Sequence, residues 1–239
     1  MQTETGSTTH DSNSATDKNT VNINDDLRQL ERDIHDALVE GTNIQETVHN
    51  LTLKAMKADR LDIDSIRRII TAVTNGVQEG AQQKFLTVSN QSQTAKTQIT
   101  AAISGLDSAL ARFAEASKLA VQEAAGHAQR FSDKELVRTK TDLESLESLF
   151  LDTLQNTASA AKGVISDILH DAANHAKNNG TVVGTQLKET LATFAQQAAS
   201  VGHAQIDASA QLAQRTAGFI HKIATGVFSG IKDHTQEKK

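Results

Sequence analysis

The chain of 239 residues contains no proline, cysteine, tryptophan or tyrosine. Proline is the strongest helix breaker, at about 3 kcal/mol in a helix interior, so its absence leaves long helical patterns uninterrupted. Without cysteine the chain forms no disulfide, thiolate nucleophile, cysteine-ligated zinc site or iron–sulfur cluster. The absence of cysteine also fits a reducing compartment, and we expect a cytoplasmic protein.

Large apolar side chains are also scarce, because aromatic residues make up 3% of the chain and hydrophobic residues 38%, many of them alanine. Alanine buries little area, so long helices of this composition have a narrow apolar seam. We therefore expect a homo-oligomer in which a partner chain completes the burial. The net charge of −5 argues against nucleic acid as a partner, because binding to phosphates needs basic patches.

The sequence carries no motif of an enzyme class. It lacks a Walker A sequence, an HExxH zinc motif and a GxSxG nucleophile motif. The nine histidines are scattered, so we expect no metal and no other cofactor. The first 14 residues have neither the basic nor the apolar region of a secretory signal. The longest uncharged stretch, residues 190–206, is rich in glutamine and serine, so we expect no membrane span.

An abrupt change of pattern separates a polar start from the rest of the chain. Residues 1–24 are rich in threonine, serine, asparagine and aspartate, which predicts a disordered tail. From Leu27 onward apolar residues follow alternating spacings of three and four, which predicts one coiled-coil seam over four heptads. The members of this seam are Leu27, Leu30, Ile34, Ala37, Gly41, Ile44, Val48, Leu51 and Ala55.

The register breaks at residues 58–64, where Asp62 or Asp64 can cap a second helix. A cation loop at these aspartates is the less favoured alternative, because the glycine and the terminal glutamate of an EF-hand loop are missing. If unbroken, the second helix spans about 65 residues, or about 100 Å. We expect residues 25–131 to form a long helical hairpin in which the apolar residues of its two helices pack together.

A second helical hairpin is expected over residues 132–232, followed by a polar tail at 233–239. Ser132 and Glu135 form a capping box, which predicts a helix start near residue 133. The run Asn178-Asn179-Gly180 predicts a stop, and a fourth helix follows it. The predicted fold is all-α, namely an elongated antiparallel helical bundle or coiled coil of three to five long helices.

Three G-x-x-x-G spacings occur, at Gly76/Gly80, Gly180/Gly184 and Gly226/Gly230. Outside apolar membrane helices this motif is unspecific. Close approach of helices, helix capping and chance explain it about equally well.

Residues 212–232 have the widest apolar face in the chain. On a helical wheel the apolar residues cover about half the circumference, opposite a sector of glycine, serine, threonine and basic residues. Such a helix suits a lipid or polymer surface, although a helix end buried by two neighbours is an alternative. The candidate surface-binding residues are Leu212, Phe219, Ile220, Ile223, Val227, Phe228 and Ile231, with Lys222 and Lys232 at the rim.

The alanine-, glutamine- and threonine-rich amphipathic stretch at 187–214 resembles phasins, the helical proteins that coat polyhydroxyalkanoate granules in bacteria. The resemblance is compositional and covers roughly residues 140–232. It implies a non-enzymatic protein that associates with a hydrophobic surface, either a polymer granule or an anionic membrane. The alternative is a cytoplasmic coiled-coil scaffold or stress-protective protein that acts through self-association or protein partners.

Overall fold

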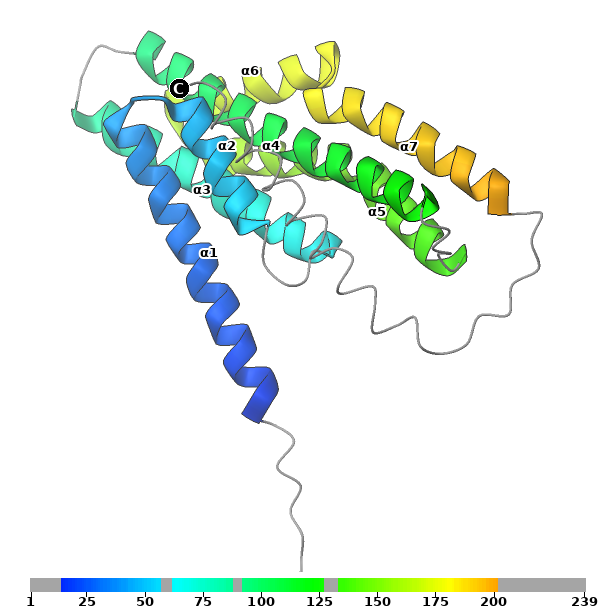
Figure 1. Ribbon diagram of the computed structural model, residues 1–239. Coiled ribbons are helices and arrows are strands. Elements are labelled where there is room, and N and C mark those ends of the chain that lie inside the picture. The colour runs from blue at the N-terminus through cyan, green and yellow to red at the C-terminus, as the bar shows by residue number, and fades with distance from the viewer. Residues whose placement is uncertain (1–13, 57–61, 88–91, 127–132, 202–239) are drawn as a thin grey trace, which may run out of the picture.

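The computed structural model describes residues 14–56, 62–87, 92–126 and 133–201, and within these ranges the regular structure is entirely helical (Figure 1). The all-α prediction is therefore confirmed. The described part holds seven helices in place of the three to five expected. They are α1 (Ser14–Glu40), α2 (Ile44–Ala55), α3 (Ile63–Thr87), α4 (Ser92–Gly126), α5 (Asp133–Ala160), α6 (Gly163–Asn179) and α7 (Val182–Val201).

Helix α1 begins at Ser14, so the disordered tail expected over residues 1–24 is wrong from Ser14 onward. The helix extends beyond the other helices at its N-terminal end (Figure 1). The continuous seam expected over residues 27–55 is wrong. The chain turns between α1 and α2, where Gly41 has a φ of 78° and Asn43 a φ of 48°. Glycine and asparagine are the residues that adopt this left-handed conformation most readily, so the turn falls where the backbone permits it.

Helices α1 and α3 run in the same direction and approach each other closely at two glycines of α3. A Cβ atom at Gly76 would lie 2.5 Å from the carbonyl oxygen of Glu31, and one at Gly80 would lie 2.7 Å from that of His35. Of the three G-x-x-x-G spacings, this one therefore serves close helix packing. Only residues without a side chain let the two backbones come this near.

The pairing of α2 with α4 repeats this arrangement. A Cβ atom at Gly105 of α4 would collide with the carbonyl oxygen of Gln45 and lie 3.2 Å from the backbone nitrogen of His49. Ile44 and Val48 are buried as expected, but α2 packs mainly on α4 and contacts α3 far less. The turn at 41–43 explains this difference, because it directs α1 and α2 toward different partners.

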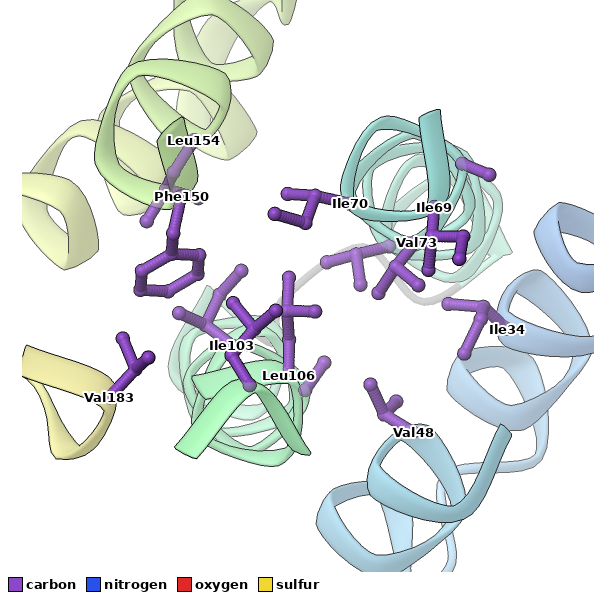
Figure 2. Packing of buried hydrophobic residues seen from close by; sticks show 14 of the residues in the cluster. Ile34, Val48, Ile69, Ile70, Val73, Ile103, Leu106, Phe150, Leu154 and Val183 are labelled. Carbon is purple, nitrogen blue, oxygen red and sulfur yellow. The ribbon is translucent and has the colours of Figure 1, made fainter. Parts of the chain in front are cut away.

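One continuous apolar cluster runs through all seven helices of the described part. Figure 2 shows Ile34 of α1, Val48 of α2, Ile70 of α3, Leu106 of α4 and Phe150 of α5 around a shared interior. Helix α4 lies at the centre of this interior and contacts α2 and α7 most extensively. Its buried residues are mostly small, which lets neighbouring helices approach it from several sides.

Buried hydroxyl groups link helices within this core. The hydroxyl of Thr157 in α5 donates to that of Thr74 in α3 at 3.0 Å, and the hydroxyl of Thr190 in α7 lies 3.1 Å from the carbonyl oxygen of Ala114 in α4. Each of these groups has a partner, so its burial carries no unpaired polar group. Among the described residues, no helix combines the length and the apolar character that crossing a membrane requires.

The contact between α1 and α3 predicts that Gly76→Ala destabilises the protein. In an uncrowded helix, glycine to alanine stabilises by about 1 kcal/mol. At Gly76 the new methyl group would meet Glu31 and Ile34, so we expect a loss of about 1–3 kcal/mol in the free energy of unfolding. Urea denaturation followed by circular dichroism measures this change.

The control is Thr100→Ala on the exposed side of α4, which improves helix propensity without a clash and should be neutral or slightly stabilising. A stabilising Gly76→Ala would contradict the close approach of α1 and α3.

Candidate functional site

The surface-binding residues predicted from the sequence lie outside the described part of the chain, which ends at residue 201. The prediction for them therefore stands on the sequence alone. These residues are Leu212, Phe219, Ile220, Lys222, Ile223, Val227, Phe228, Ile231 and Lys232. What the structure does describe is how α7, the helix that leads to this segment, is held.

The N-terminus of α7 is capped by a carboxylate from another helix. Asp107 of α4 accepts the backbone N–H of Val182 at 2.8 Å through one oxygen, and that of Val183 at 2.9 Å through the other. The free N–H groups in the first turn of a helix carry partial positive charge, which favours an anion there. Asp107 therefore fixes both the position and the direction of α7 on α4.

A second carboxylate approaches the same helix end from α5. The hydroxyl of Thr181 donates to Glu147 at 2.5 Å and accepts the backbone N–H of Gly184 at 2.8 Å. A Cβ atom at Gly184 would collide with the carboxylate of Glu147. Gly184, the second glycine of the Gly180/Gly184 spacing, thus leaves room for the side chain of Glu147 from α5. Three helices meet at this cluster, which we call the α7 cap: Asp107, Glu147, Thr181 and Gly184.

Burial is the main influence on Asp107, and it raises the pKa of its carboxyl above the ordinary value of 3.8. The hydrogen bonds from Val183 and Val182 lower this pKa, whereas the nearby Glu147 raises it further. The net shift of this pKa is upward. Placing the charged Asp107 carboxylate in this buried position beside Glu147 therefore has an electrostatic cost that the two hydrogen bonds do not fully offset. The described contacts of this cluster hold the start of α7.

Two histidines lie beside the glycines at which the helix pairs approach. His35 has its Nδ1 2.9 Å from Asp36 and its Nε2 2.6 Å from Gln83, and the hydrogen bond to Asp36 raises the pKa of His35 although burial lowers it. His49 has a buried Nδ1 without a partner, and burial together with Arg112 lowers its pKa. Both side chains lie at helix contacts, and neither belongs to a cluster that could bind a metal.

Within the described ranges, no three histidine, aspartate or glutamate side chains come together as a metal site. Asp62 caps α3 by accepting the backbone N–H of Ser65 at 2.7 Å, as one of the two predicted caps. Burial raises the pKa of Asp62, but the hydrogen bonds from Ser65, together with Arg68 and Arg138, leave the pKa below its ordinary value. Asp62 therefore has a capping role.

The chain belongs to a family of unknown function, DUF6781, whose pattern matches residues 20–237. The match covers α2 to α7, most of α1 and the whole 212–232 segment. No curated protein and no solved structure matches the chain.

The cap on α7 predicts that Asp107→Ala weakens the attachment of this helix. Removing a capping carboxylate costs about 0.5–2 kcal/mol, and here two backbone N–H groups lose their acceptor. We expect the free energy of unfolding to fall by this amount, and the amides of Val182 and Val183 to exchange faster with solvent. Chemical denaturation and hydrogen exchange measure the two effects.

Asp152→Ala on the exposed side of α5 is the matched control and should change neither quantity appreciably. Equal effects of the two substitutions would mean that Asp107 does not hold α7.

The raised pKa of Asp107 predicts a pH dependence of stability. Between the ordinary value of 3.8 and the pKa in the folded protein, the folded state keeps a proton that the unfolded chain has released. This proton-linked part of the stability, which is separate from the hydrogen bonds to Val182 and Val183, is thus fully present below 3.8 and is lost as the pH rises through the folded pKa of Asp107. Carboxyl carbon NMR should give a midpoint above 3.8, and Asp107→Asn should remove this part of the stability profile.

Proposed function

We propose that the protein is a non-enzymatic helical protein that associates with a hydrophobic surface through residues 212–232, in the manner that the resemblance to phasins implies. The described helices serve as the body that carries this segment. The observation that carries the proposal is a contrast in apolar surface. The body has covered its apolar faces, whereas the widest apolar face in the sequence belongs to residues 212–232.

The body itself offers little apolar surface for adhesion. Among the described residues, the exposed large apolar side chains are Leu86 at 83% exposure, Val182 at 58%, Leu119 at 55% and Val164 at 39%. These four residues come from four different helices, and two of them lie at helix starts. Single exposed apolar residues are common on protein surfaces and need no partner. Binding to a lipid or polymer surface is therefore better assigned to residues 212–232.

The contacts of α7 with the other helices support a role for α7 in connecting residues 212–232 to the body. The α7 cap fixes the start of α7, and Lys118 of α4 pairs with Glu189 of α7 at 3.2 Å further along. Phe194 is buried in the common core. The last described helix before residues 212–232 is therefore attached to the body at several points.

A scaffold that acts by self-association is the alternative proposal. Self-association was expected because the narrow, alanine-rich seam of a single chain buries little apolar area. In the described helices, one chain buries that seam against its own neighbours, because seven helices share one core. The burial within one chain therefore gives less reason to expect a partner chain. Homo-oligomerisation stays a prediction that light scattering coupled to gel filtration can test.

Surface association predicts that two charges in the middle of the 212–232 apolar face abolish binding. Ile223→Asp with Val227→Asp places carboxylates where the segment would enter an apolar surface, which is strongly unfavourable. We expect the natural protein to float with anionic phospholipid vesicles, or with polyhydroxyalkanoate granules, and the double variant to stay in solution.

The matched control is Thr225→Asp with Ser229→Asp, which adds the same two charges to the polar sector of the same segment. We expect this control to keep most of the binding and to lose only the contribution of repulsion from anionic headgroups. Natural protein that floats with neither vesicles nor granules would rule out the proposed function. Equal loss of binding in both double variants would point to net charge as the cause.

A further inference from the structure

The junction between α6 and α7 holds the dipeptide Asn179-Gly180 in an exposed position. Asn179 is the last residue of α6, and Gly180 follows with a φ of 82°, a left-handed conformation that favours glycine. Both residues are exposed, and a Cβ atom at Gly180 would have no neighbour within 4 Å. The backbone at this point is therefore open to solvent.

The backbone nitrogen of Gly180 also differs from those at other helix ends. The amides that follow α1, α2 and α5 each donate to a carbonyl oxygen of the preceding turn. No acceptor among the described residues takes the N–H of Gly180. This nitrogen can consequently turn toward the side chain of the residue before it without losing a hydrogen bond.

The side-chain amide of Asn179 is held beside a histidine. Its nitrogen Nδ2 lies 2.9 Å from Nδ1 of His175 and donates to the His175 carbonyl oxygen at 3.0 Å. Because an amide nitrogen only donates, Nδ1 of His175 accepts this N–H; once the imidazole has taken up a proton, it can pass that proton to a nitrogen that becomes basic during a reaction. His175 is exposed, so its ring is accessible to water.

We propose that Asn179 is a site of spontaneous deamidation, with His175 as the proton donor to the leaving nitrogen. The backbone nitrogen of Gly180 attacks Cγ of Asn179, and a five-membered succinimide forms. The bond from Cγ to Nδ2 breaks, and ammonia leaves with the proton that Gly180 loses and that His175 relays. Water then opens the succinimide at either carbonyl group and gives aspartate or isoaspartate at position 179.

The same dipeptide occurs a second time, at Asn75-Gly76, in a setting that prevents this reaction. Gly76 is buried in the middle of α3, where its backbone nitrogen belongs to the regular helix and an added Cβ atom would lie 2.5 Å from the carbonyl oxygen of Glu31. Forming the succinimide there would require α3 to unwind and to leave α1. The chain thus contains an internal control for the effect of structure on this chemistry.

The reaction would place a new negative charge in the last turn of α6. A carboxylate at the C-terminal end of a helix is unfavourable, because the free carbonyl groups there already carry partial negative charge. The new group would also lie two residues before Thr181, whose hydroxyl binds Glu147 in the α7 cap. Deamidation would therefore add an acidic group next to a helix end that already holds two.

The test is to incubate the folded, full-length protein at neutral and mildly alkaline pH and to follow two tryptic peptides by mass spectrometry. Peptide 178–188 contains Asn179, and peptide 69–84 contains Asn75. Fragmentation distinguishes Asn179 from its neighbour Asn178, which is followed by asparagine and serves as a further control. We expect Asn179 to convert about tenfold faster than Asn75 or more, because Asn75 reacts only after local unfolding of α3.

In concentrated urea the two dipeptides should convert at similar rates, which shows that the difference comes from the fold. His175→Ala, at an exposed helical position, should keep the fold and slow the conversion of Asn179. Equal rates of Asn179 and Asn75 in the folded protein, or an Asn179 that stays intact, would overturn the proposal. An unchanged rate in His175→Ala would overturn the role of His175.

Discussion

The close approach of helix backbones at glycine is the constraint on which the rest of the structure depends. At Gly76, Gly80 and Gly105 there is no space for a side chain, because the backbone of α1 or α2 fills it. These contacts draw α1 onto α3 and α2 onto α4, and α4 then carries α7 on another side. Helices so close together need only small and aliphatic side chains between them. This explains how a chain with 3% aromatic residues and no tryptophan or tyrosine still forms a continuous core.

The apolar pattern predicted which residues are buried much better than it predicted which helices touch. Leu30, Ile34, Ile44 and Val48 are all buried, as the spacing indicated. The same spacing runs through Gly41 without interruption, although the chain turns there, because α1 and α2 each need an apolar face. A periodic apolar pattern indicates that one face of a helix is buried, but it does not indicate which other helix covers that face. Which helices pair depends on where two helix backbones can approach closely, and a few glycines determine those places.

The α7 cap was beyond the reach of sequence reasoning for a related reason. Asp107 sits in the middle of a helix with nothing local to distinguish it from other surface acids, and its partners lie 75 and 76 residues away. By contrast, the stop at Asn178 to Gly180 and the cap at Asp62 were predicted, because capping depends on residues within one turn. The proposed surface segment at 212–232 likewise rests on a local pattern, the width of its apolar face.

A surface segment that is separate from the body, as we propose for residues 212–232, has an energetic advantage. A protein that uses the same apolar face for its core and for adhesion must unfold in part in order to bind, and so loses the free energy of that core. Here the buried residues of α1 to α7 already form one cluster within a single chain. Transfer of residues 212–232 to a surface would then leave this cluster intact. In this arrangement the affinity for the surface depends on the segment, whereas the stability of the body depends on the glycine contacts and the α7 cap.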